Sequence, residues 1–116
     1  MLVFYRAMSR TTLSYGAVSI LHAVAAGSRF GFDIMAATGL TSGTVYPTLD
    51  RLEQNGLLTS RWEEEQAAHA EGRPARRYFT LTLKGASGLQ HALARYKTLR
   101  PITIDPKSLD PERGHS

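Results

Sequence analysis

Residues 31–57, GFDIMAATGLTSGTVYPTLDRLEQNGL, decide the fold because they contain two helical patterns separated by a short turn. The first pattern predicts a helix over residues 31–37, which Gly39 ends. The second predicts a helix that a hydroxyl residue at position 41 or 42 caps and that ends before Gly56. Apolar residues recur along this helix at i, i+4 and i+7, which places on its inner face Val45, Leu49 and Leu52. Two helices joined by a turn of about three residues predict a helix-turn-helix.

A helix before this motif and a hairpin after it complete a winged form. The upstream apolar pattern predicts a helix that Thr12 or Ser14 caps and Gly27 ends. Downstream, the pattern of the side chains changes to a period of two, which predicts strands over residues 58–63 and 77–83. Two strands around a polar loop form a hairpin, and a hairpin directly after the helix-turn-helix forms a wing. The predicted fold class is α+β, a winged helix-turn-helix of three helices and a two-stranded wing.

The C-terminal third of the chain predicts one more helix. The loop between the strands, residues 66–74, has turn-forming and small residues without a period and is expected to be irregular. Thr82 can cap a helix that runs to about Leu99, and Pro101 stops it. The remaining residues are rich in proline and poor in apolar side chains, so an extended or disordered tail is expected.

The composition limits the chemistry of this chain of 116 residues, which has no cysteine and a formal net charge of +4. The length fits one domain. The lack of cysteine excludes disulfides and thiolate chemistry and favours a reducing compartment such as the cytoplasm. No apolar run is long enough to span a membrane. Eleven of the 14 basic residues are arginine, an excess that suits an anionic partner and, equally, a GC-rich genome.

No motif predicts an enzyme or a bound cofactor. Residues 85–88, Gly-Ala-Ser-Gly, miss the nucleophile elbow of hydrolases by one residue. The sequence also lacks the glycine-rich dinucleotide fingerprint and a phosphate loop with lysine. A metal site is not expected, because no i,i+3 or i,i+4 pair occurs among the histidines His22, His69, His91 and His115.

The outward residues of the second motif helix suit contact with DNA. Its first turn, residues 41–44 (Thr-Ser-Gly-Thr), is small and hydroxylated, so it can approach a groove and donate backbone N–H groups to phosphate. Farther along, Arg51 is expected either to bind phosphate or to pair with Asp50 or Glu53. The hairpin loop adds three arginines that are expected to contact an adjacent minor groove or the backbone, namely Arg73, Arg76 and Arg77.

Two motifs resemble the bacterial PadR-type transcriptional regulators. One is V-Y-P-T-L-D-R-L-E at residues 45–53, followed by N-G-L-L at 55–58, and the other is E-G-R-P-A-R-R-Y-F-T-L-T at 71–82, followed by K-G. The resemblance implies a homodimeric repressor of a palindromic operator, and some members release DNA on binding phenolic acids or planar hydrophobic drugs. With the outward helix face, it gives the candidate DNA contacts Thr41, Ser42, Gly43, Thr44, Tyr46, Pro47, Arg51, Arg73, Arg76 and Arg77.

The resemblance also predicts how the chain is divided. We expect an N-terminal arm at 1–12, the winged helix-turn-helix domain at 13–83, a dimerisation helix at 84–100 and a flexible tail at 101–116. Short members of the family dimerise mainly through one C-terminal helix that packs on the partner. The apolar stripe of the predicted helix then supplies the interface candidates Leu89, Leu93, Tyr96 and Leu99.

Several alternatives stay open at this stage. Tyr46 either contacts phosphate or packs against the wing, and Trp62, the only tryptophan, is expected to pack under the wing rather than stack on a ligand. Pro47 is costly inside a helix, so the helix is expected to be continuous but bent there. A winged helix that binds only protein shares this fold. Exposed apolar residues would mark that alternative, whereas the hydroxyl and arginine side chains favour DNA.

Overall fold

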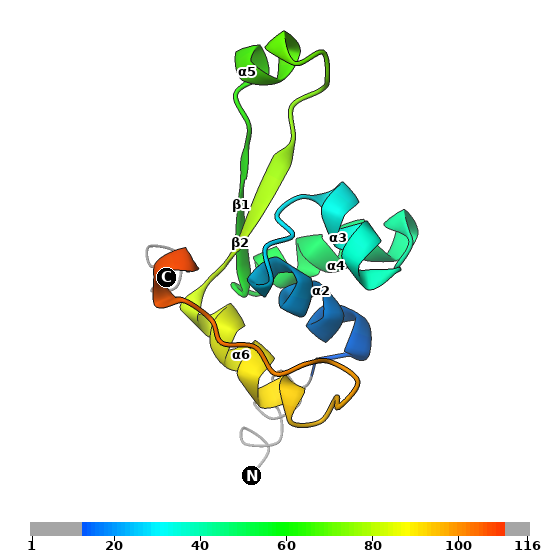
Figure 1. The fold of residues 1–116 in the computed structure, drawn as a ribbon, viewed down its shortest axis with the longest axis vertical. Helices are drawn as coiled ribbons and strands as arrows, with labels where there is room; N and C mark the ends of the chain where they lie inside the picture. Colours follow the sequence, from blue (N-terminus) through cyan, green and yellow to red (C-terminus); the bar gives the residue numbers. More distant parts are fainter. Residues whose placement is uncertain (1–12, 111–116) are drawn as a thin grey trace.

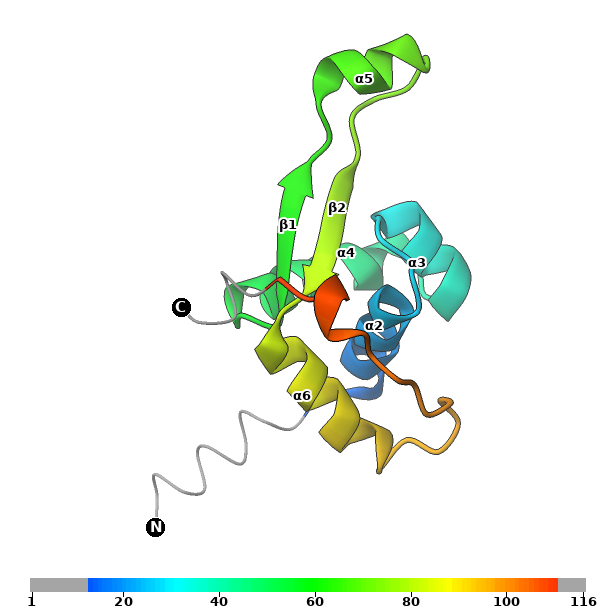
Figure 2. The ribbon, with the colours of Figure 1, turned by 60° about the vertical axis from the view of Figure 1, so that its left-hand side comes forward.

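The computed structural model describes residues 13–110, and the predicted α+β winged helix-turn-helix is confirmed (Figure 1). A long hairpin projects from a body of helices and carries a short helix at its tip (Figure 2). In chain order the elements are α2 (Tyr15–Ala25), α3 (Gly31–Thr38), α4 (Ser42–Gln54), β1 (Leu58–Trp62), α5 (Glu65–Ala70), β2 (Arg77–Leu81), α6 (Leu83–Leu93) and the 3₁₀ helix η1 (Pro106–Ser108).

Helices α3 and α4 form the helix-turn-helix at the predicted place. Gly39 ends α3 with a φ of 76°, a left-handed conformation in which its N–H donates to the Met35 carbonyl at 2.8 Å. Thr41 is the N-cap of α4, and the helix continues through Pro47 to Gln54. The prediction of one continuous helix across Pro47 is therefore confirmed. The predicted inner stripe of α4 is buried as well.

The core lies around α2, against which α3, α4, β2 and α6 pack. Val18, Ile20 and Leu21 of α2 have no exposed surface. At the start of α6, Gly85 lies so close to the Leu57 backbone that an added Cβ would overlap the Leu57 carbonyl. Only glycine fits there, and the contact fixes α6 against the base of the hairpin. None of the described helices is long and apolar enough to cross a membrane.

The hairpin differs from its prediction at both ends. The strands pair antiparallel with Ser60 opposite Phe79, but they end at residues 62 and 81, and Leu83 begins α6 instead of extending the strand. Thr82 causes this early end, because its hydroxyl accepts the Gly85 N–H as the N-cap of α6. The loop at the other end is not irregular. Its alanines favour helix, and α5 forms there with one of them buried.

The C-terminal helix is shorter than predicted. It ends at Leu93 because the chain turns back onto the N-terminal side of the domain. The Arg95 guanidinium and the Tyr96 hydroxyl both donate to the Leu13 carbonyl, at 3.1 and 3.0 Å. The Tyr96 ring also packs edge-on against Tyr15, with 5.2 Å between ring centroids. These contacts favour the turn over further helix.

Residues 101–110 of the predicted tail are mostly extended, and they contact the domain. This segment runs along the domain, held by the Gln90 amide, which donates to its main chain at 2.9 Å, and by the Asp110 N–H, which donates to the Leu81 carbonyl at 2.8 Å. The rest of the predicted tail and the predicted N-terminal arm lie outside the described residues. The segment packs because it carries three partly buried apolar side chains, Ile102, Ile104 and Leu109.

Candidate nucleic-acid interface

The N-terminal end of α4 forms an exposed polar surface. All four residues from Thr41 to Thr44 are exposed, and no side chain caps the amides of the first turn. The positive end of the helix dipole and these amides favour an anion at this position. The predicted DNA contacts Thr41, Ser42, Gly43 and Thr44 are thus placed together on one accessible surface, which Pro47 extends on the next turn.

Tyr46 joins this surface to the start of α3. Its side chain is 48% exposed, and its ring lies against Gly31, the first residue of α3. A Cβ on Gly31 would come within 2.6 Å of Tyr46 Cε1 and 2.7 Å of Cζ, far inside ordinary contact. Gly31 therefore provides the space that the tyrosine ring occupies. We did not predict this role, although a glycine at a helix start, where Ala would be a better helix former, was a signal for it.

Arg73, predicted to contact DNA, is occupied inside the wing. Its guanidinium binds Glu63 through two hydrogen bonds, at 2.5 and 2.8 Å, and Glu71 at 3.2 Å. The hydrogen bonds from Arg73 hold the pKa of Glu63 down to about 2. The same carboxylate accepts the Arg76 N–H at 3.2 Å. Arg73 therefore links the two sides of the hairpin between the paired strands and α5, a segment called the neck below. Its charge is already paired with two carboxylates.

Arg77 is also occupied, in this case by α4. Its guanidinium pairs with Glu53 at 2.5 Å and with Asp50 at 3.4 Å, and its Nε donates to Ser60 at 3.0 Å. Two carboxylates on the outward side of α4, those of Asp50 and Glu53, therefore pair with an arginine of the wing. The prediction of Arg77 as a DNA contact missed these partners. Arg77 instead links the wing to α4 through these ion pairs.

Two of the predicted arginines have no carboxylate of the described residues within ion-pair distance, although the charge of Arg76 helps to lower the pKa of Glu63. Arg51 is exposed and donates only to the Thr48 hydroxyl, at 3.3 Å, so neither of its expected pairings with an acidic neighbour is formed. The Arg76 guanidinium stacks over the Phe30 ring, 4.2 Å from its centroid. Within residues 13–110, neither guanidinium forms an ion pair. These two side chains are the best placed of the predicted arginines to meet an anion.

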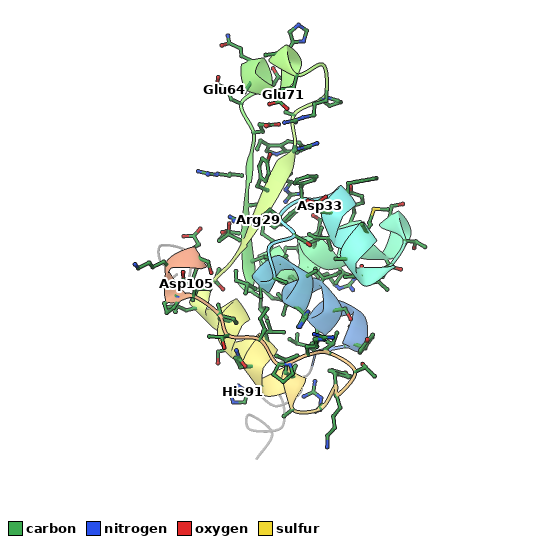
Figure 3. The ribbon with its side chains drawn as sticks, in the orientation of Figure 1. Arg29, Asp33, Glu64, Glu71, His91 and Asp105 are labelled. Carbon is green, nitrogen blue, oxygen red and sulfur yellow. The ribbon has the colours of Figure 1, made fainter. Side chains whose placement is uncertain are left out.

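The tip of the wing is acidic. Residues 63–73 carry four carboxylates against the single guanidinium of Arg73. Figure 3 shows Glu64 and Glu71 at this tip, far from the helix body. Such a tip repels phosphate. Among the three loop arginines, Arg76 is the one without an ion pair in the described part of the chain, and it lies next to the outer end of the paired strands.

A cleft of about 500 Å³ lies between the outer part of the wing strands and the helices α3 and α4. Two large side chains at its edge are strongly exposed, Phe32 at 73% and Trp62 at 67%. The expected burial of Trp62 under the wing is wrong, because this last residue of β1 lies at the edge of the open cleft. Phe32 was not predicted as a site residue. Its place two residues before the buried Ile34, on the opposite side of α3, was the signal for it.

The predicted dimer contacts lie mostly in the chain's own fold. Leu89 has no exposed surface and belongs to the core, so it is not accessible to a partner. The other three candidates are partly buried against the same core, namely Leu93, Tyr96 and Leu99. The apolar stripe of α6 faces the chain's own domain because α6 packs directly on α2. No group of metal-ligating side chains occurs in the described part of the chain.

The helix-turn-helix, its exposed polar helix end and the adjoining hairpin define a winged-helix protein of the DNA-binding class. Residues 20–91 match the transcriptional regulator PadR-like family, and the chain belongs to that family. This confirms the resemblance seen in its two motifs. It makes the chain a transcriptional regulator whose fold is that of a DNA-binding protein.

Solved structures with similar folds agree. A PadR-like transcription factor from Bacteroides fragilis is 27% identical, with a TM-score of 0.61 over 82% of this chain and 90% of that one. A PadR family transcriptional regulator from Eggerthella lenta is 21% identical, with a TM-score of 0.53 over 85% and 90%. A MarR family regulator from Silicibacter pomeroyi is 18% identical, with a TM-score of 0.56 over 89% and 67%, and shares the fold alone. No curated protein is significantly similar.

Proposed function

We propose that the protein is a cytoplasmic, homodimeric repressor that binds a palindromic operator and is released by a small hydrophobic effector. One observation carries the DNA-binding part of this proposal. The first turn of α4 is exposed and uncapped, and two guanidinium groups without ion pairs, Arg51 and Arg76, belong to the same helix and to the adjoining wing. A helix end with these properties suits a groove lined by phosphates.

In the proposed complex, the N-terminal end of α4 enters the major groove. Ser42 and Thr44 are small enough for close approach, and their hydroxyls can bond base edges. Tyr46 lies one turn farther along, where its hydroxyl can donate to a phosphate. Arg51 and Arg76 neutralise phosphates without having to give up an acidic partner. In each chain, the proposed interface therefore consists of an uncharged surface on α4, called the reading surface below, and two arginines that contact phosphates.

Dimerisation supplies the second half of the proposed operator contact. One chain presents a small cationic surface, and a two-fold axis doubles it. We expect half-sites separated by roughly 34–36 Å or a multiple of this length. The surface for the partner is the outward side of α6 and the turn after it, where Leu83 is 47% exposed. Leu93 and Leu99 retain part of their surface there.

A protein-binding winged helix is the second candidate, and the acidic tip together with the exposed Trp62 and Phe32 favours it. A salt titration separates the two. If Arg51 and Arg76 of both chains meet phosphates, about four counterion sites are involved, and log K falls with log[salt] at a slope of about −3.6. Absence of duplex binding at low salt would remove the DNA function. Operator selection from a random DNA pool then identifies the sequence that is bound.

A further inference from the structure

The cleft beside the wing combines one free cation with an aromatic lining. Arg76 provides the cation, held over Phe30 at 4.2 Å. The two other arginines of the lining are neutralised by carboxylates. The remaining lining is largely apolar and aromatic, and includes Trp62, Phe32 and Tyr46. Three of the five exposed large hydrophobic side chains of the described residues thus gather at one cleft.

This combination matches the chemistry of one nucleotide of a DNA strand. A guanidinium binds phosphate, and an aromatic ring can pack on the apolar face of a deoxyribose, which stays accessible in a duplex while the base faces are stacked. A single uncompensated arginine is a weak anchor for a highly charged ligand, but it suits one phosphate flanked by apolar groups. The volume of about 500 Å³ also accommodates a group of this size.

The cleft is continuous with the proposed reading surface. Tyr46 belongs to both, since it lies on the outward side of α4 and lines the cleft. A strand that passes the N-terminal end of α4 therefore continues toward Arg76 and Trp62. The acidic tip beyond Trp62 disfavours a strand that follows the wing farther, because its carboxylates outnumber the single guanidinium of Arg73 and the excess negative charge repels phosphate.

We propose that this cleft receives one strand of duplex DNA, with a phosphate at Arg76 and with Trp62 packed on the adjacent deoxyribose. This inference rests on the proposed DNA-binding function and assigns a contact within it. The wing then acts by an aromatic contact at the outer end of its paired strands rather than by arginines at its tip. Phe32, on α3, lines the same cleft.

Trp62 makes the test direct because it is the only tryptophan in the chain. The full-length protein is titrated with its selected operator duplex while indole emission and its quenching by acrylamide are recorded. Packing on DNA is expected to change the emission and to protect it from acrylamide. In parallel, W62A is expected to weaken binding by at least about 5-fold, the loss expected when an interface aromatic residue is truncated. W62F is expected to keep most of the affinity.

The controls separate this inference from the function on which it rests. Trp62 is exposed, so W62A is expected to fold, which circular dichroism verifies. Q66A changes an exposed neutral residue of the same wing and is expected to bind like the wild type. Both the emission change and the affinity loss are required. If the wild type binds the operator but either result is missing, the aromatic contact is wrong and the DNA function stands. If the wild type binds no duplex, the DNA function itself is wrong.

Discussion

Gly31 tests whether the position of Tyr46 matters for DNA binding. In G31A, the new Cβ would lie 2.6 Å from Tyr46 Cε1, whereas ordinary contact begins at 3.4 Å. The tyrosine ring must therefore move by about 1 Å or adopt another rotamer, since it is the far end of a flexible side chain and the α3 backbone is not. The substituted residue is compatible with its backbone, because Gly31 does not have a positive φ.

The effect on stability is expected to be small and the effect on binding large. Alanine gains up to about 1 kcal/mol over glycine in a helix, which offsets the cost of moving the ring. Loss of a hydrogen bond to a phosphate costs about 1.5–3 kcal/mol, or roughly 10- to 150-fold in affinity. Fluorescence anisotropy with the operator duplex measures the affinity, and urea denaturation measures the free energy of unfolding.

A double-mutant cycle shows whether Gly31 acts through Tyr46. In the Y46A background the ring is absent, so an added methyl group at position 31 meets no clash. G31A is therefore expected to have no further effect on binding in that background. The reasoning is refuted if G31A binds like the wild type, or if it weakens binding equally in the presence and absence of the Tyr46 ring.

Three further predictions concern the wing and its base. R76A is expected to weaken binding to all duplexes alike and to lower the salt slope of a dimer by about two, whereas R73A is expected to leave the slope unchanged; a lower slope for R73A would contradict its internal role. The pKa of Glu63 is lowered in the folded state, so its contribution to stability is present above the ordinary carboxyl pKa and is lost as the pH falls toward 2. E63Q is expected to flatten the acid limb of stability between about pH 4.5 and 2, and an unchanged limb in urea titrations at several pH values would count against this. The buried Thr82 hydroxyl bonds one backbone carbonyl and one backbone N–H, and T82V leaves both of these groups without that partner. The free energy of unfolding in chemical denaturation is expected to fall by about 1–3 kcal/mol. A change below about 0.5 kcal/mol would show that water replaces the hydroxyl.

The sequence was sufficient for the helix-turn-helix because local signals and packing agree there. Gly39 supplies the left-handed turn, and the stripe from Val45 to Leu52 has the period of a helix and is buried. Where local sequence signals and packing disagreed, the prediction failed. The run 66–74 has no apolar period, yet its alanines form α5 because only one side chain needs burial. The tail from Pro101 has few apolar residues, yet three of them meet the core.

The candidate site was harder to predict because it depends on which charges meet in space. Arg73, Arg76 and Arg77 are close in sequence and chemically alike, and nothing local distinguishes them. Their partners come from elsewhere, since Glu63 lies across the hairpin and Glu53 lies on α4. An arginine with such a partner positions an element, and an arginine without one can bind an anion.

In the proposed function, this division separates the arginines that position the wing from those that can meet DNA. Because Arg77 ties the wing to α4 and Arg73 closes its neck, the cleft is held at a fixed place relative to the first turn of α4. Of the predicted arginines, Arg51 and Arg76 form no ion pair within residues 13–110, so the sequence-independent attraction that the predicted contacts supply rests on these two. In the proposed complex, affinity also comes from contacts that need the right fit, namely the α4 end, Tyr46 and the aromatic cleft, repeated in the proposed partner subunit. Changes of shape around Gly31 and Trp62 are therefore expected to weaken operator binding as well as loss of charge at Arg76.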